Sequence, residues 1–439
     1  MLVGLAVLIS LFYAEEDWRG KRAWENCKRE LEAKGEILDW NKFIPPPVSD
    51  DQNFIKAPKM QEWFVRPDWH HPSLTNELTE RLRNDKTGWF GKDSKIKTEV
   101  DAKDYLTWSD QFKPDFDSIR DALKRPYARM DGDYSLSFEM PTINFVVVRA
   151  ISQTLAQRAN CYLLLGQPEK ALDELTLLHD LCRLLESKPT GKPITLVSAM
   201  INIAVSGLYA ETIANGLQMK AWREPQLIAL QEQLRQMDMS PALIESIREE
   251  RAGECHFIEM NFIAKIQQIK NPKIICGWFY QNMVTIARLD QEAIDSVDLT
   301  NNFILPKRVD KTQSEIDALG KHFRPSTFFA EIVVPNLAKA FETLARNQTT
   351  VDEAQIVCAL ERFRHAHGEY PNTLDALAPQ FIEKLPHDII GGQPLHYRRT
   401  DDGKFLLYSV GWNETDDGGL PGTLSDVKSG DWVWQYPAK

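Results

Sequence analysis

Between residues 333 and 419, a helical pattern gives way to short strand-like runs separated by turns. Residues 352–367 carry apolar side chains at close to the helical period, and Gly368 after them suits a helix C-terminal cap. Residues 395–398 and 405–409 have the character of strands, and the Asp-Asp-Gly between them suits a hairpin turn. This order of signals predicts a small α+β unit in the C-terminal part of the chain.

The same order resembles the globular head of type II secretion major pseudopilins, and the pilin-like modules at the end of some bacterial envelope proteins. A prepilin cleavage signature is absent, and the residues before Val333 are too polar for a membrane-inserting helix. The resemblance therefore implies a pilin-like head used as a module, and not a filament subunit. The matching pieces are Val334-Pro-Asn-Leu337, the helix around Ala359 and Leu360, Gly368-Glu-Tyr-Pro371, Leu385-Pro-x-Asp388, Gly392-x-Pro-Leu395, Tyr397 and Phe405-x-x-Tyr-Ser-x-Gly411.

The resemblance also implies a calcium site, because major pseudopilin heads bind Ca²⁺ in a loop at their C-terminal end. Here that loop is 411–419, in which Asn413, Asp416 and Asp417 are oxygen donors of the kind that Ca²⁺ prefers. Two adjacent aspartates with glycines also suit a plain turn, and the loop lacks a spaced Asp-x-Asp-x-Asp set. Calcium is the one cofactor that the sequence suggests, and the plain turn stays open as the alternative.

The chain of 439 residues is long enough for two or three domains and has an ordinary globular composition. Its formal net charge of −11 argues against a nucleic-acid partner, because no basic surface is available to displace counterions from phosphates. The six cysteines lack CxxC or zinc-site spacing, which favours buried free thiols. A bridge between Cys161 and Cys182 across a helical hairpin is the alternative in an oxidising compartment.

Residues 1–14 are almost wholly apolar but fall short of the roughly 20 residues that a spanning helix needs. Three interpretations compete: a membrane anchor clipped at its upstream end, a signal peptide with an atypical start, and a buried start of the first helix. We favour the anchor, because the apolar run begins at residue 1 without a lead-in. Residues 15–57 are expected to form a charged helix, ended by Gly35, and a proline-rich linker.

Three segments near the N-terminus resemble a family of membrane-anchored proteins, without an established activity, from bacteria with complex envelopes. The resemblance implies location in the cell envelope, with most of the chain periplasmic or extracytoplasmic, and it implies no particular chemistry. The segments are Trp18-Arg-Gly-Lys-Arg-Ala-Trp24, Phe43-Ile-Pro-Pro-Pro47 and Asp51-Gln-Asn-Phe54.

The expected fold class is mainly α. We expect a mixed, irregular segment at 58–139, a helical body at 140–326 and the pilin-like α+β domain at 327–439. In the body, two amphipathic runs on either side of Gly166 resemble a single tetratricopeptide hairpin, which predicts solenoid-like packing.

Residues 194–210 carry no charged side chain, and Ser198, Asn202 and Ser206 recur every four residues along one stripe. The apolar run is shorter than a full span, because Glu211 closes it. We therefore expect a buried helix that packs its small polar side chains against a neighbour, in preference to a membrane span.

The densest cluster of titratable side chains lies on one predicted helix. Glu249 and His256 are seven residues apart, Glu259 follows three residues later, and the three could seed a metal site or an acid/base pair. Glu250 and Glu254 lie on the same helix. No second helix is evident that would complete a ligand set, so a solvated or salt-bridged helix face is the favoured interpretation.

Two smaller groups of histidine and acidic residues are interpreted as structural and not as metal or catalytic sites. His70 and His71 follow Asp68, but adjacent side chains of an extended segment point to opposite sides, and a converging third ligand is not evident. Glu361 and His365 have the spacing of an ordinary surface pair on a helix.

Two functional hypotheses follow. The first is a non-enzymatic, membrane-anchored protein whose helical scaffold and pilin-like head bind another protein or an envelope component. The second is a hydrolase-like enzyme with a site between helices near His256. A deep pocket where Glu249, His256 and a third polar group converge would favour the enzyme, whereas solvent-facing side chains would leave binding as the default.

Overall fold

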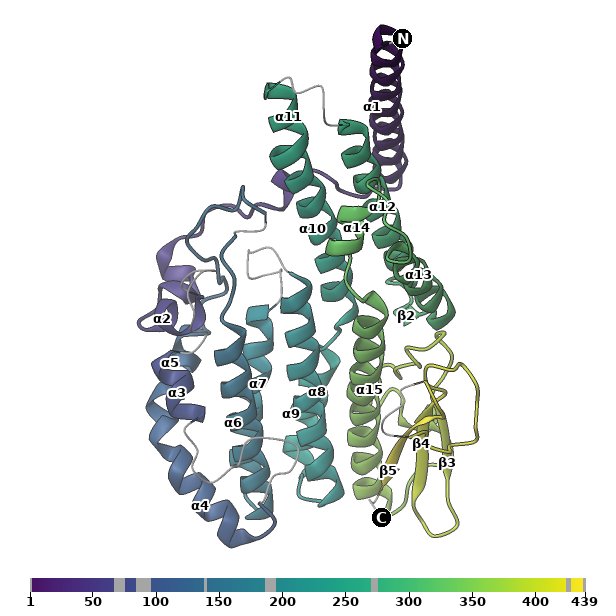
Figure 1. Ribbon diagram of the computed structural model, residues 1–439. Coiled ribbons are helices and arrows are strands. Elements are labelled where there is room, and N and C mark those ends of the chain that lie inside the picture. Colours follow the sequence, from purple (N-terminus) through teal and green to yellow (C-terminus); the bar gives the residue numbers. More distant parts are fainter. Residues whose placement is uncertain are drawn as a thin grey trace.

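The computed structural model describes residues 2–66, 76–83, 96–137, 140–185, 195–269, 275–423 and 428–436. The described chain is mainly helical, with small antiparallel sheets toward the C-terminus (Figure 1). The helices are α1 (Leu2–Ala33), α2 (Met60–Phe64), α3 (Glu77–Arg83), α4 (Glu99–Ser109), α5 (Lys113–Ala122), α6 (Phe145–Leu164), α7 (Pro168–Cys182), α8 (Leu196–Gln218), α9 (Glu224–Arg235), α10 (Ser240–Ile258), α11 (Ala264–Ile269), α12 (Cys276–Ile294), α13 (Pro306–Leu319), α14 (Phe328–Val333) and α15 (Leu337–His367). The strands are β1 (Val297–Asp298), β2 (Phe303–Ile304), β3 (His396–Arg399), β4 (Phe405–Ser409) and β5 (Trp432–Tyr436).

The body is a group of long helices packed side by side. α6 pairs with α7 and also contacts α8, and α15 packs against both α8 and α9 (Figure 1). Gly207 permits a close approach of α8 to α15, because a Cβ there would lie 2.7 Å from the Asn347 side chain. Asn347 uses this proximity to donate a hydrogen bond of 2.9 Å to the Ile203 carbonyl oxygen.

Helix α8 confirms the prediction of a buried helix with a small polar stripe. Ser198, Asn202 and Ser206 are all buried. By length and composition α8 is the one described helix that could cross a membrane, but 61% of its most apolar window is buried inside the protein. Core helices of soluble proteins pass the same test, so this is weak support for a membrane association.

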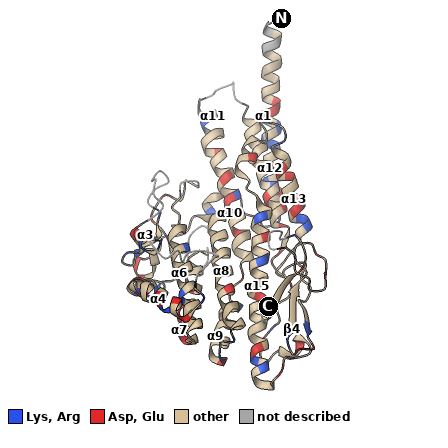
Figure 2. Ribbon diagram, turned by 60° about the horizontal axis from the view of Figure 1, so that its bottom comes forward, with Lys and Arg blue, Asp and Glu red and all other residues tan. Residues whose placement is uncertain are grey.

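Helix α1 is a single 32-residue helix that packs against α12 at its inner part and projects from the body at its N-terminal part (Figure 1). Val7, Leu8, Ile9, Leu11 and Phe12 are exposed along the projecting part. The third interpretation of this segment, a buried start of the first helix, is therefore wrong for these side chains. Residues 1–14 contain no charged side chain, whereas Figure 2 shows both signs of charge interspersed over the body.

The C-terminal sheet has the antiparallel order β3-β4-β5 and packs on α15. The hairpin β3–β4 is confirmed, with Tyr397 opposite Leu407, and Gly403 takes the positive φ of 74° that its turn requires. Gly368 ends α15 with a φ of 85°, as predicted. Two features were not predicted: β5, which pairs with β4, and the start of α15 at Leu337, well before residue 352.

Three further expectations can be compared with the structure. The region 58–139 contains α2 to α5, and a capping box between Thr98 and Asp101 starts α4. The last part of the expected helical body contains α13. All six cysteines are buried and free, which confirms the expectation of buried thiols over a bridge between Cys161 and Cys182.

Candidate functional site

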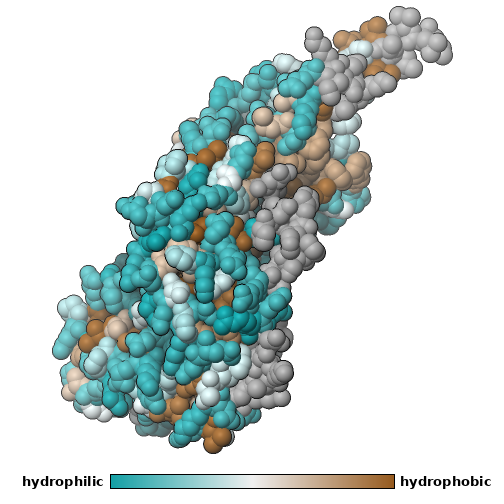
Figure 3. Space-filling model, turned by 90° about the vertical axis from the view of Figure 1, so that its left-hand side faces the viewer, coloured by the Kyte–Doolittle hydropathy of each residue, from teal (hydrophilic) through white to brown (hydrophobic). Residues whose placement is uncertain are grey.

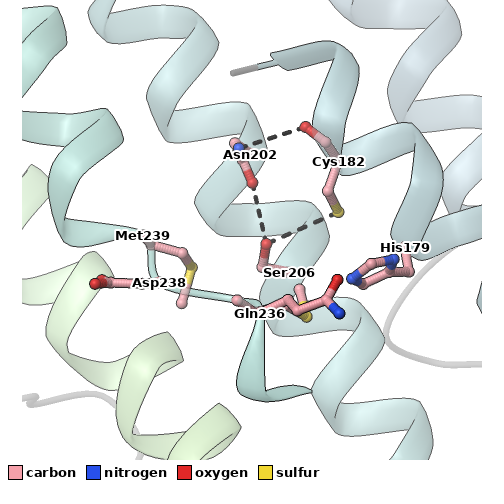
Figure 4. A pocket seen from close by; sticks show the side chains of 8 residues that line it. His179, Cys182, Asn202, Ser206, Gln236, Asp238 and Met239 are labelled. Carbon is pink, nitrogen blue, oxygen red and sulfur yellow. Dashed lines mark hydrogen bonds between the residues drawn. The ribbon is translucent and has the colours of Figure 1, made fainter. Parts of the chain in front are cut away.

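A small pocket lies between α7, α8 and the turn that joins α9 to α10 (Figure 4). Its volume of about 120 Å³ is room for a few water molecules or a small polar solute. Its walls are mostly polar and include the small polar stripe of α8. The lining residues are His179, Cys182, Asn202, Ser206, Gln236, Met237, Asp238 and Met239.

Hydrogen bonds connect the two helices that form the floor of this pocket. The Ser206 hydroxyl donates to Asn202 Oδ1 at 3.1 Å and contacts Cys182 Sγ at 3.8 Å, and Asn202 Nδ2 lies 3.5 Å from the Cys182 carbonyl oxygen. The His179 ring is buried, and its Nδ1 lies 3.5 Å from Asp180 Oδ1. In Figure 4 the side chains of His179 and Gln236 point toward one another. The floor is thus a connected polar network inside a helical core.

The rim of the pocket is held by α15. Gln348 accepts a hydrogen bond of 3.1 Å from the Met239 backbone N–H and donates one of 3.1 Å to the Met237 carbonyl oxygen. Gln348 also donates to Asp352 at 3.1 Å, and burial raises the pKa of the Asp352 carboxyl well above its usual range. The pocket therefore has a fixed rim and can hold a small neutral polar molecule or water without rearrangement.

A second polar cluster, which sequence reasoning missed, joins α10 to α12. Glu254 of α10 and Asp290 of α12 are both buried, and burial raises the pKa of both carboxyls, that of Asp290 to about 8. Glu250 accepts a hydrogen bond of 2.7 Å from the Leu196 backbone N–H, and burial raises its pKa to about 7. The expectation of a solvated helix face is wrong for these glutamates, because Glu254 is buried with Asp290 of α12 and Glu250 is half-buried against the start of α8. Only the pairing of two helices distant in sequence could reveal this.

An ion-pair cluster beside it ties the end of α1 to α10. Glu36, just after α1, accepts two hydrogen bonds from Arg248, at 3.1 and 3.0 Å, and one of 2.5 Å from Arg251. Arg251 is fully buried and also donates to Gln291 at 2.7 Å. Burial opposes ionisation of Glu36, but the hydrogen bonds from both arginines outweigh it and hold its pKa below the usual range. This cluster is structural in character.

The residues proposed for an acid/base site near His256 lie in different environments. Glu249 is buried, His256 is half-buried, and Glu259 is exposed on a π-helical turn, Glu259–Ile263. The pocket at His179 is lined by other residues. Among the described residues, no group of three or more His, Cys, Asp or Glu side chains is arranged to hold a metal ion.

The other sequence candidates are placed as follows. Glu361 is buried and pairs with Arg364 at 2.6 Å, so the expected surface pair with His365 is wrong. Glu361 also accepts a hydrogen bond from the Tyr370 hydroxyl. Asp68, His70 and His71 lie outside the described residues.

The calcium candidates lie in the loop that follows β4. Asp416 accepts hydrogen bonds from the Tyr408 hydroxyl at 3.0 Å and from the Gly418 backbone N–H at 2.8 Å. Asn413 Nδ2 donates to Asp417 at 3.3 Å. Asp431, which sequence reasoning missed, accepts hydrogen bonds from the backbone N–H groups of Asp417 and Gly419.

This loop supplies carboxylate oxygens of the right chemical kind for Ca²⁺. However, Asn413 Oδ1 accepts a hydrogen bond from the Thr415 backbone N–H, as a turn residue does. Both hydrogen bonds to Asp416 end on Oδ1, so Oδ2 of this carboxylate accepts neither of them. The calcium site stays a prediction.

Comparison with known proteins found no relative of this chain. No family model, no curated protein and no solved structure matches the chain. The function is therefore argued from the geometry of the chain itself.

Proposed function

We propose that this chain is a non-enzymatic, membrane-anchored protein of the bacterial cell envelope. In this proposal a solenoid-like helical scaffold carries a pilin-like head that binds another protein or an envelope component, and most of the chain is periplasmic. The observation that carries the proposal is the form of α1, in which an exposed apolar part continues without a break into a part clamped to the body.

The exposed part of α1 has the properties of an anchor. Leu8 is 66% exposed and Leu11 is 61% exposed, and large apolar side chains grouped in this way on a projecting helix are costly in water. The inner part is fixed to the start of α12, where Asp17 accepts a hydrogen bond of 2.7 Å from the Gly277 backbone N–H. The apolar part can therefore enter a bilayer while the inner part stays joined to the body.

Two features support the finer description of scaffold and head. The pair α6 and α7, with α8 against both, is the kind of packing that a helical repeat uses. The packing of the long helix α15 against a short antiparallel sheet suits a pilin-like head. Fold-level resemblance does not fix a function, so the partner has to be found by experiment.

The enzyme alternative near His256 draws less support from the geometry. It requires Glu249, His256 and a third polar group to converge in a deep pocket, whereas Glu249 is buried, His256 is half-buried and the pocket at His179 is lined by other residues. We therefore keep binding as the proposed activity.

The experiment that tests the anchor is membrane fractionation of the full chain in a bacterial host. A variant with Leu8→Ser, Leu11→Ser and Phe12→Ser is expected to move from the membrane to the soluble fraction, because three large apolar side chains exposed on α1 become polar. The matched control is Val100→Ser with Leu420→Ser, which changes two equally exposed apolar residues elsewhere. Equal membrane association of the variant, the control and the native chain would rule out the anchor.

A further inference from the structure

A second group of exposed apolar side chains lies on and around α14. Phe323 is 73% exposed and Ile332 is 62% exposed, Phe328 is exposed too, and so is Met260 on the turn whose Phe262 contacts Phe329 of α14. Large apolar side chains on a surface occur singly by chance, but a group on neighbouring elements marks an interaction site. We call these four residues the aromatic patch.

The patch rests on a layer of phenylalanines formed by Phe329 of α14 itself and by Phe262 and Phe279 from two other segments of the chain. The Phe262 and Phe279 rings stack with their centroids 5.1 Å apart, and the Phe329 ring lies 4.8 Å from Phe262. Phe328 contacts Phe329, and Phe323 contacts Phe328, each at 5.6 Å. The exposed rings are therefore the outer layer of an aromatic cluster, and not isolated side chains on a loop.

A buried amide fixes α14 in this position. Asn282 of α12 is fully buried, and its Oδ1 accepts hydrogen bonds from the backbone N–H groups of Phe329 at 2.8 Å and Ala330 at 3.1 Å. Its Nδ2 donates to the carbonyl oxygens of Trp278 at 2.7 Å and Pro325 at 2.9 Å. Because the backbone on both sides of Phe328 is held, the patch loses little further freedom when it binds a partner.

Basic side chains flank the patch. Lys321, His322 and Arg324 are all exposed, and within the described residues neither the Lys321 nor the Arg324 side chain has an ion-pair or hydrogen-bond partner. Glu331 of α14 is an exposed acidic side chain close to Gly320, one residue before Lys321. In a chain with a net charge of −11, two cations without partners beside exposed phenylalanines suit an anionic surface.

The patch lies toward the end of the body from which α1 projects. Gly277 contacts α1, and Phe279, two residues further along α12, belongs to the aromatic cluster. On the face shown in Figure 3, apolar residues gather below the projecting segment. A bilayer that takes up the outer part of α1 would therefore be close to this end of the body.

We propose that the aromatic patch and its flanking cations bind the surface of an anionic lipid bilayer. The phenylalanines would enter the interfacial region, and Lys321 and Arg324 would contact anionic headgroups. The inference rests on the proposed membrane anchoring, and adds that the body lies against the bilayer instead of standing away from it on α1.

The test uses the full chain with the α1 substitutions Leu8→Ser, Leu11→Ser and Phe12→Ser, so that the patch is the remaining contact. Binding is measured by flotation with phosphatidylcholine vesicles, with and without phosphatidylglycerol. We expect residual binding to the anionic vesicles only, and an about thirtyfold loss when Lys321→Gln and Arg324→Gln are added. Adding Phe323→Ser and Phe328→Ser is expected to abolish it, whereas the control Val100→Ser with Leu420→Ser leaves it unchanged.

Hydrogen exchange on the native chain gives an independent readout. Amides of residues 321–333 are expected to exchange more slowly when anionic vesicles are present. If no such protection is seen, and the patch variants bind vesicles as well as the control does, the patch does not bind lipid. That result would leave the proposed anchoring through α1 unaffected. A dimer of the native chain in solution that Phe323→Ser with Phe328→Ser dissociates would also overturn it, since a second copy would then be the partner.

Discussion

Gly20 of α1 lies directly against Gly277 of α12, and neither position has room for a side chain. A Cβ on Gly20 would overlap the carbonyl oxygen of Gly277, and a Cβ on Gly277 would overlap that of Glu16. The two backbones meet where Asp17 accepts the Gly277 N–H. This contact decides how firmly the projecting helix is joined to the body.

We predict that Gly20→Ala separates α1 from α12 and lowers the free energy of unfolding by about 1–3 kcal/mol, the usual cost of overpacking. The overlap outweighs the gain of roughly 1 kcal/mol that alanine brings to a helix interior. The measurement is urea denaturation in detergent. The control is Gly4→Ala on the same helix, where a Cβ meets nothing within 4 Å. If Gly20→Ala and Gly4→Ala have the same free energy of unfolding, the close contact between α1 and α12 is wrong.

We predict that Glu36→Gln destabilises the fold by about 3 kcal/mol, because it leaves the fully buried Arg251 without its carboxylate. Chemical denaturation provides the measurement. Glu32→Gln, four residues earlier, removes an exposed carboxylate with a weak 3.9 Å partner and should change stability by less than about 0.5 kcal/mol. A loss as small as that of Glu32→Gln would show that Glu36 does not hold Arg251.

The buried carboxyls predict a fall in stability with rising pH. The pKa of Asp290 is raised from 3.8 to about 8 in the folded protein, so the folded state holds a proton that the unfolded state releases. Its contribution is therefore fully present below about pH 4 and is lost as the pH rises toward 8.

Asp290→Asn should flatten this fall and stabilise the protein at pH 8 by about 1–2 kcal/mol, because the amide resembles the protonated acid and needs no deprotonation. The measurement is a series of thermal melts between pH 5 and about pH 8. Asp104→Asn, at an exposed position, is the control and should follow the native profile. A native-like profile for Asp290→Asn would mean that Asp290 ionises freely in the folded state.

Calcium is expected to raise the melting temperature if the loop after β4 binds it, since a ligand of the folded state alone stabilises that state. Asp417→Asn should remove both the shift and the heat of a calorimetric titration, whereas Asp401→Asn in the β3–β4 turn should retain them. The absence of heat and of a shift with the native chain would end the calcium prediction.

The elements that the sequence indicated best are those whose signal is local. The cap at Gly368, the hairpin at Gly403 and the polar stripe of α8 each depend on a few neighbouring residues, and all three are present. Strand β5 was missed because its pairing with β4 is long-range, whereas α1 runs as one helix through the change from apolar to charged residues.

The candidate sites depended on contacts that no local pattern contains. Glu254 has the sequence context of a solvent-facing glutamate, yet Asp290 and the rest of α12 cover it. The pocket at His179 is formed by helices that are distant in sequence. The hydrogen bonds of Asn282 likewise join α12 to α14, which lies far along the chain.

The amino-acid sequence determined the helical class of the body, the apolar start of α1 and the hairpin of the C-terminal sheet, because period and turn chemistry are encoded within a few residues. Only the tertiary structure decided which glutamates are buried, how α1 is joined to α12, and which phenylalanines stay at the surface. The physical reason is that burial is a property of two packed surfaces, and each segment of the sequence describes only one of them.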